Sequence, residues 1–260
     1  MCRLFAFSFH KNTTKDSKVS IVSLFKNLSL HGAVLPTSQP GHIDGWGMAM
    51  YPSDKNVPHQ HRSVKSAHLD ETFDEDLFFR EGFSQSGLVH LRKKTIGETL
   101  LENTHPFIHG SYSFIHNGTV SHAEAYPTLT SHCKGGTDSE RLFRRFLEIK
   151  ATKGLMTLDA YREMLLEVQN IYPEHSALNT MLHDGEQIYV SRSINMNNKN
   201  YSEDELLNYY TLYLGKTVKG DVIVSSEMLP YENTVYTLLP NHSLSIIDIT
   251  NNNVETLLFA

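Results

Sequence analysis

The 260-residue chain has only two cysteines, Cys2 and Cys133, too few for a disulfide framework, so a reducing, cytoplasmic setting is the default expectation. No apolar run approaches the ~18 residues that a membrane helix needs. Polar residues begin at His10, too early for the apolar part of a signal peptide. The net charge is −6 and no basic block occurs, which argues against a nucleic-acid-binding surface. Repeats and convincing linkers are also lacking, so we expect a single domain over 1–260.

Hydrophobic residues make up 40% of the chain and charged residues 20%, a balance typical of an ordered globular protein. Aromatic or glycine-rich alternation predicts strands at 2–10, 45–51, 86–95 and 111–118. Helical spacing predicts helices at 17–28, with Ser17 as the cap, at 158–172, and after the capping box Thr137-x-x-Glu140. The last third returns to short strands. This order of elements favours an α+β layered domain with mainly antiparallel sheets.

Cys2 stands directly after the initiator methionine and ahead of an apolar strand. It could be a buried strand residue, a metal ligand, or a nucleophile that becomes the first residue once Met1 is removed. A free N-terminal amine has a pKa of about 7.7–8.0, so it can act as a general base near neutral pH. One residue would then supply both nucleophile and base, as in N-terminal threonine catalysis.

Three further positions carry polar groups at the ends of predicted elements. Arg92 follows an apolar strand and is either a structural ion-pair partner or a fork for a carboxylate. Asn117-Gly118 is either a hairpin turn or an oxyanion hole made of a side-chain amide and a backbone N–H. Asp138 is either an acid favoured at a helix start or a partner for an ammonium group. Together with Cys2, these groups describe a pocket for glutamine or another γ-glutamyl compound.

This set of motifs closely resembles the class II glutamine amidotransferases, which are N-terminal-nucleophile hydrolases. The motifs are "MC" at the start, "DGWG" at 44–47, "HLRKKTIGE" at 90–98, "NTHPF" at 103–107, "HNGTV" at 116–120 and "TDSE" at 137–140. The chain looks most like the stand-alone, YafJ-type branch, which is similar to enzymes that remove γ-glutamyl groups from glutathione or ergothioneine precursors. The resemblance implies a four-layer αββα sandwich of two antiparallel sheets.

The resemblance also implies roles for individual residues. The catalytic residues would be Cys2, Asn117 and Gly118, and the substrate-binding residues would be Arg92, Thr95, Gly97 and Asp138. Further pocket residues would be Trp46, Gly47 and Lys93. His105 and His116 match family positions and are expected to pin strand ends through imidazole hydrogen bonds. Lys93 and Ile96 depart from the tryptophan and histidine of synthase-linked members, which puts glutamine itself in doubt as the preferred substrate.

The implied reaction is hydrolysis of a γ-glutamyl amide through a thioester on Cys2, with release of glutamate and with no cofactor. A second reading is a glutaminase subunit that supplies ammonia to a separate synthase chain, and a third is a non-catalytic glutamine or γ-glutamyl-binding protein. A zinc site formed by His90, His105, His116 and His122 lacks any supporting ligand motif. We therefore expect a small-molecule substrate and no metal, nucleic-acid or membrane partner. Cys133 is expected to be a loop thiol.

Overall fold

The computed structural model describes residues 2–36, 38–52, 56–79, 85–95, 97–123, 132–172, 174–197 and 201–259. Its helices are α1 (Lys15–His31), α2 (Glu75–Phe78), α3 (Asp138–Lys153), α4 (Thr157–Ile171), α5 (Glu203–Tyr209) and the 3₁₀ turn η1 (Leu101–Asn103). Its strands are β1 (Arg3–Ser8), β2 (Trp46–Tyr51), β3 (His59–Ser63), β4 (Ser86–Leu91), β5 (Phe107–His109), β6 (Tyr112–Asn117), β7 (Asn179–His183), β8 (Gln187–Arg192), β9 (Tyr213–Thr217), β10 (Val222–Ser225), β11 (Thr234–Leu238), β12 (Ser243–Asp248) and β13 (Val254–Leu258).

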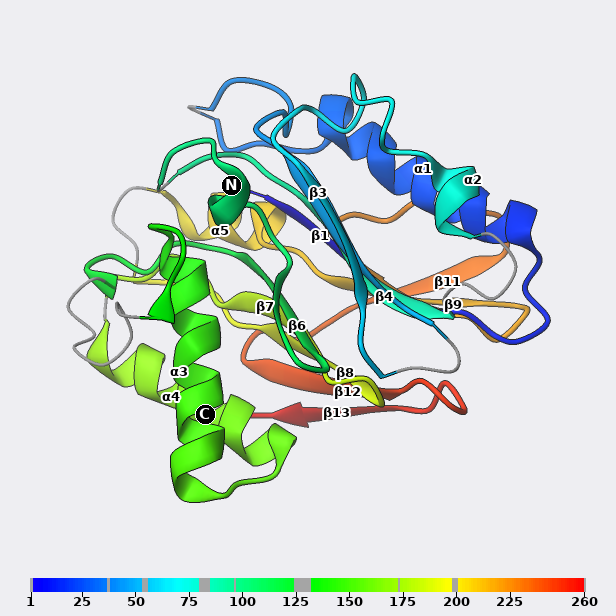
Figure 1. Cartoon of the computed structure of the whole chain (residues 1–260). Helices are drawn as coiled ribbons and strands as arrows, with labels where there is room; N and C mark the ends of the chain where they lie inside the picture. The colour runs from blue at the N-terminus through cyan, green and yellow to red at the C-terminus, as the bar shows by residue number, and fades with distance from the viewer. Residues whose placement is uncertain are drawn as a thin grey trace.

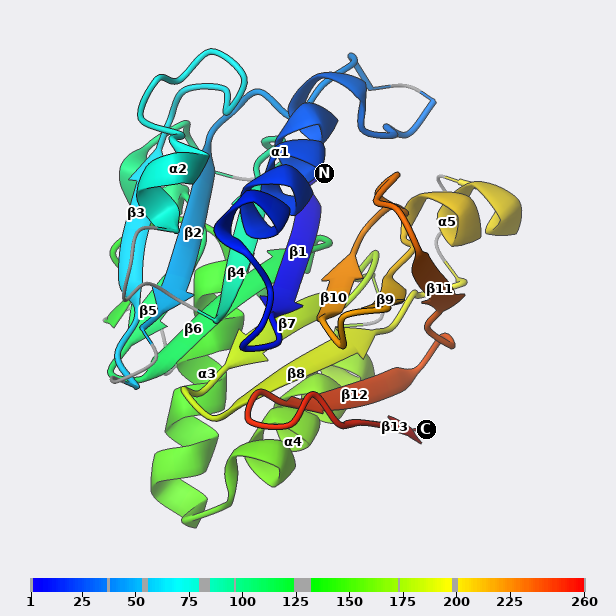
Figure 2. The ribbon, with the colours of Figure 1, turned by 90° about the vertical axis from the view of Figure 1, so that its right-hand side faces the viewer.

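The strands form two antiparallel sheets. One has the order β11-β9-β10-β1-β4-β2-β3, and the other has the order β13-β12-β8-β7-β6-β5. Helices α1 and α2 cover the outer face of the first sheet, and α3 and α4 cover the outer face of the second (Figures 1 and 2). The expected four-layer αββα sandwich is therefore confirmed.

Alternation along β1 shows how the layers are specified. Phe5 and Phe7 point outward, and the Phe5 ring stacks on Phe25 of α1 with the centroids 5.0 Å apart. Leu4 and Ala6 point the other way, into a core between the sheets that also contains Ile115 of β6. Since successive side chains in a strand face opposite sides, both faces of β1 must be apolar, as its sequence is.

The helix starts differ in detail from the sequence-based predictions. Thr14, rather than Ser17, caps α1, and its hydroxyl accepts from the Ser17 N–H at 3.3 Å. Thr137 caps α3 as predicted, accepting from the Glu140 N–H at 3.3 Å. The Glu140 carboxylate, however, accepts from the N–H groups of Lys134 and Gly135 instead of closing the box.

Helix α5 begins at Glu203, directly after a run of polar residues. Ser202 and Glu205 form a reciprocal capping box, each side chain accepting from the other residue's N–H. The signal was present in the sequence as Ser-x-x-Glu ahead of an apolar pair. Within the described ranges, no helix combines the length and the apolar character needed to cross a membrane.

His183 of β7 is an imidazole enclosed between the two sheets. It stacks on the Tyr51 ring with the centroids 3.5 Å apart, and its Nε2 lies 2.9 Å from Ser86 Oγ. Burial lowers the pKa of His183 to about 3. An unfolded histidine has a pKa of about 6.5. Between about pH 6.5 and pH 3, His183 is therefore protonated in the unfolded chain and neutral in the folded chain.

We predict that His183 makes the protein acid-sensitive. It should contribute a loss of about 1.4 kcal/mol of unfolding free energy per pH unit as the pH falls below about 6.5. His183→Gln should make the plot of unfolding free energy against pH shallower by that amount between about pH 5.5 and 4. Urea titrations across this range would measure it. His68 is exposed, so His68→Gln is the matched control. Equal slopes of unfolding free energy against pH for the two variants would contradict the prediction.

Candidate active site

The predicted site residues come from segments that meet at one end of the sandwich. Cys2 precedes β1, Arg92 and Lys93 follow β4, Asn117 ends β6, and Asp138 starts α3. β1 and β4 are paired in register, with Arg3 opposite Leu91, and both pack against β6 across the core. The strand ends are therefore brought together by the stacking of the two sheets.

Cys2 is held by contacts from both sheets. Its backbone nitrogen donates to Asn117 Oδ1 at 2.9 Å. Its Sγ lies 3.5 Å from the Lys93 N–H donor nitrogen and 3.6 Å from the Lys93 carbonyl oxygen. The residue is partly exposed. Cys2 thus sits, partly exposed, between the end of β4 and the end of β6.

Asn117 and Gly118 do not form a hairpin turn, because the chain after Gly118 runs through α3 and α4 before it returns as β7. Asn117 is 1% exposed, and its Nδ2 has no hydrogen-bond partner among the described residues. A Cβ on Gly118 would come within 1.9 Å of the Ala177 carbonyl oxygen, so only glycine fits there. The arrangement leaves a buried amide donor next to the Cys2 nitrogen.

Asp138 is buried at the first residue of α3 and joins the helix to the turn after Gly118. One carboxylate oxygen accepts from the Val120 N–H at 2.7 Å and the other from the Ser139 N–H at 2.9 Å. His116 supports the same junction, with Nδ1 3.0 Å from Ser139 Oγ and Nε2 3.1 Å from the Ala177 carbonyl. An ionised carboxylate has about four acceptor positions, so Asp138 keeps capacity for a further donor.

Arg92 is 3% exposed at the end of β4. Its Nη2 donates to the Glu98 carbonyl at 3.2 Å, and its backbone pairs with Asp44 and Gly45. Burial lowers the pKa of Arg92, while the neighbouring Cys2 and Asp44 oppose that change. A guanidinium starts from a pKa of about 12.5 or more, so it stays charged. Arg92 therefore supplies a buried positive charge near Cys2.

Asn103 is a site component that the sequence reasoning did not single out. Its Nδ2 donates to the Glu98 carbonyl at 2.9 Å, and its Oδ1 accepts from the Gly136 N–H at 2.8 Å. It thereby joins the segment that follows Arg92 to the segment that precedes Asp138. The only sequence signal was its place in "NTHPF", a polar residue at the edge of an apolar turn.

The remaining predicted residues are placed as follows. Gly97 adopts φ +77°, and a Cβ there would come within 3.0 Å of Asn103 Nδ2, whereas Thr95 is exposed on the same segment. Gly47 lies where a Cβ would come within 2.1 Å of the His105 carbonyl oxygen, so it permits close packing of the chain there. Ile96 lies outside the described residues.

Trp46 lies on the opposite face of β2 from Gly47. Its ring is 1% exposed in the core beneath α1 and α2, packed edge-on against Phe73 with the centroids 4.6 Å apart. Its Nε1 donates to Asp70 Oδ2 at 3.0 Å. The structure thus places this side chain under the helices and away from the Cys2 face of the sheet.

Two buried histidines, His90 and His105, lie near Arg92. The rings of His90 and His105 are 4.1 Å apart, and their ring nitrogens have no hydrogen-bond partner among the described residues. His105 therefore differs from His116, which makes the strand-pinning bonds expected of both. Burial lowers the pKa of each ring well below its usual range. In the ranges that the structure covers, no three His, Cys, Asp or Glu side chains are placed to hold a metal ion.

Lys93 holds the loop that follows α1. Its ammonium donates to the Gln39 carbonyl and, at 2.9 Å, to the Gly41 carbonyl. Because its backbone also contacts Cys2 Sγ, Lys93 links this loop to the thiol.

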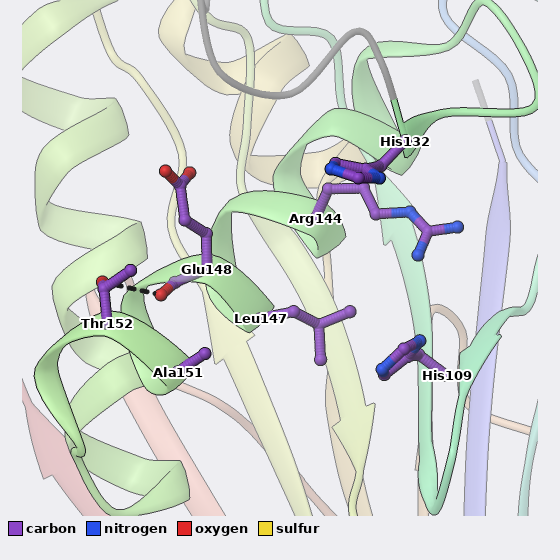
Figure 3. Close-up of a pocket in the computed structure, with 7 residues that line it drawn as sticks. All are labelled: His109, His132, Arg144, Leu147, Glu148, Ala151 and Thr152. Carbon is purple, nitrogen blue, oxygen red and sulfur yellow. Dashed lines mark hydrogen bonds between the residues drawn. The ribbon is translucent and has the colours of Figure 1, made fainter.

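A cavity of about 340 Å³ lies elsewhere, on the outer side of α3 (Figure 3). His109, His132 and Arg144 lie toward one end of it and Glu148 and Thr152 toward the other. None of the predicted site residues lines this cavity.

Comparisons with known proteins agree with the family resemblance. The family model described as glutamine amidotransferases class-II matches residues 1–202. A probable glutamine amidotransferase, DUG3 of Saccharomyces cerevisiae, is 26% identical over 256 residues, covering 82% of this chain and 71% of that protein. Among solved structures, a glutamine aminotransferase class-II domain protein from Silicibacter pomeroyi superposes with a TM-score of 0.62 at 19% identity over the full length of both chains.

The glutamine phosphoribosylpyrophosphate amidotransferase from B. subtilis superposes with a TM-score of 0.66 at 12% identity. All of this chain is covered, but only 49% of that one, so the present chain spans about half of it. At these identities the solved structures support the fold alone.

We predict that Lys93→Met makes the loop that follows α1 more mobile. Losing two charge-assisted hydrogen bonds should raise amide hydrogen exchange in residues 38–44 by about tenfold, since such bonds contribute roughly 1.5–3 kcal/mol each when buried and less when partly exposed. Mass spectrometry of peptides from this segment would measure the change. Lys94→Met is the matched control, since the Lys94 ammonium lies 3.8 Å from the exposed Glu98. Unchanged exchange in Lys93→Met would contradict the loop-holding role.

Proposed function

Because this chain belongs to the class II glutamine amidotransferases, we propose that it hydrolyses the γ-glutamyl amide of glutamine or of a related γ-glutamyl compound. In this proposal residues 1–260 act as one domain and Cys2 is the nucleophile after removal of Met1. The observation that carries the proposal is the placement of Cys2: its nitrogen bonds Asn117 Oδ1 at 2.9 Å, and its thiol lies at the end of β4 beside Lys93.

The amine and the thiol of Cys2 would divide the acid–base work. Once Met1 is removed, the Cys2 nitrogen is an amine that accepts a hydrogen bond or proton and is oriented by Asn117 Oδ1. It takes the thiol proton, and the thiolate attacks the γ-carbonyl carbon. The resulting ammonium then donates that proton to the leaving nitrogen as the C–N bond breaks. A thioester remains on Cys2.

Asn117 and Gly118 would stabilise the negative charge that develops on the carbonyl oxygen. The Asn117 Nδ2 is buried and unpartnered within the described structure, which is the state expected of a donor reserved for a transient oxyanion. The Gly118 N–H follows it along the chain. Water then attacks the thioester with the Cys2 amine as base, and glutamate leaves.

Arg92 and Asp138 would hold the amino-acid end of the substrate. The Arg92 guanidinium pairs with the α-carboxylate, and the Asp138 carboxylate accepts from the α-ammonium. Thr95 and Gly97 would lie in the substrate-lining turn that follows Arg92. Because Asp138 also holds the turn after Gly118, substrate binding and the oxyanion hole share one support.

We predict that Cys2→Ala abolishes glutamate release. The assay is a panel of glutamine, γ-glutamyl amines and γ-glutamyl peptides, with wild-type protein verified by mass to begin at Cys2. The matched control is Cys133→Ser, which removes the other thiol and should keep wild-type turnover. Glutamate release by Cys2→Ala at the wild-type rate, or full activity in protein retaining Met1, would rule the mechanism out.

The panel also separates this proposal from the ammonia-supply alternative. A stand-alone hydrolase should release glutamate from at least one panel member without any other protein. Release that requires an added synthase chain would favour the alternative. Stable binding of glutamate without turnover of any member would favour a non-catalytic binding protein.

Asn117→Asp should lower kcat by about 10²–10³-fold, because it replaces the buried N–H donor with an acceptor while keeping an oxygen for the Cys2 nitrogen. KM should change much less, since the lost contact forms with the oxyanion rather than with the bound substrate. Steady-state kinetics on the best panel substrate would test this. A KM increase at constant kcat would place Asn117 in substrate binding instead.

A further inference from the structure

Arg3 is a fully buried cation directly after the proposed nucleophile. Its side chain is 0% exposed, and its Nε lies 2.8 Å from Glu227 Oε1. Its guanidinium carbon lies 4.5 Å above the centre of the Tyr209 ring. It also donates to the Ala33 carbonyl. A buried charge is tolerated only when it is paired and hydrogen-bonded, so these three contacts explain how Arg3 can sit there.

The partners of Arg3 come from three separate segments: Ala33 from the loop after α1, Glu227 from the segment after β10, and Tyr209 from α5. Two of these partners are also joined to each other, since Glu227 Oε1 accepts from the Ala33 N–H at 2.7 Å. Arg3 therefore connects the start of β1 to three surrounding elements at once.

The β-ladder alone does not hold Cys2. Pairing of β1 with β4 begins at Arg3 and pairing with β10 begins at Phe5, so Cys2 lies beyond both ladders. On the β10 side, the Leu4 N–H donates to Ser226 Oγ at 2.9 Å and the Ser226 N–H donates to the Leu4 carbonyl at 3.0 Å. The next residue, Glu227, forms the ion pair with Arg3. One backbone bond and two side chains thus continue the contact where the β1–β10 ladder stops.

We propose that Arg3 is a positioning residue for Cys2, and that the ion pair between buried Arg3 and partly exposed Glu227 fixes the thiol against the Lys93 backbone and the Cys2 nitrogen against Asn117. The inference rests on the proposed function for its kinetic readout. Successive side chains of a strand point to opposite faces. Anchoring the Arg3 side chain on one face therefore sets the direction of Cys2 on the other.

The test compares Arg3→Met, Glu227→Gln, the double variant and a matched control, Arg145→Met. Arg145 also makes a close ion pair, 2.8 Å from Glu167, but between α3 and α4. Both single variants should lower kcat about 10- to 100-fold with KM within about threefold, because small displacements of a reacting group are costly. Arg145→Met should keep the wild-type kcat.

The double variant separates positioning from stability. Removing Glu227 alone leaves the buried Arg3 charge uncompensated, whereas removing both partners does not. The double variant should therefore regain thermal stability over Glu227→Gln while kcat stays low. Recovery of both stability and kcat would overturn the proposal, as would a folded Arg3→Met with wild-type kcat. If Arg3→Met fails to fold, Glu227→Gln and the double variant decide by the same criteria.

A second readout does not depend on turnover. The rate at which iodoacetamide modifies Cys2, followed by mass spectrometry in a Cys133→Ser background, should fall about tenfold in Arg3→Met and in the double variant, because the thiol loses its place beside the Lys93 N–H. An unchanged rate would contradict the positioning role. If wild-type protein hydrolyses no panel substrate, the proposed function fails and this rate alone decides the role of Arg3.

Discussion

The hydrogen bond from the Cys2 nitrogen to Asn117 Oδ1 joins the two sheets at the point on which the candidate site depends. Cys2 precedes a strand of one sheet and Asn117 ends a strand of the other, so the bond forms only if the sheets stack with these ends level. The core between them, built from residues such as Leu4, Ile115 and Met181, sets that alignment. A one-residue slip of β1 against β4 would turn Cys2 to the opposite face and break the contact.

Around this bond, several side chains pair with backbone groups of neighbouring loops. Asp138 holds the turn after Gly118, and Asn103 joins the segment after Arg92 to the start of α3. Each loop that carries a site residue is therefore tied to another such loop. A polar group that satisfies a buried backbone N–H or carbonyl is costly to remove, which keeps the loops in one arrangement.

Sequence patterns predicted the parts of this site better than their assembly. Apolar alternation located β1, β4 and β6, and capping chemistry located the start of α3 at Asp138. The patterns located β1 as an aromatic-rich strand but not the elements that cover each of its faces, so the sandwich itself came from the family resemblance. Asn103 and Arg3 were not predicted, because their partners are distant in sequence. Asn103 contacts Gly136, and Arg3 contacts Glu227. Trp46 was expected near the pocket because its motif is there, yet strand alternation turns it to the other face.

Two arginines and two histidines are buried near Cys2, and they differ in charge. His90 and His105 are enclosed behind Arg92, and burial keeps the pKa of each imidazole well below its usual range, so neither adds positive charge near neutral pH. Arg92 stays charged because its pKa starts far higher. Arg3 is a second buried cation, but Glu227 neutralises it on the opposite face of β1. Near Cys2, the positive charge on this face of β4 therefore comes from Arg92 and not from the two neutral histidines.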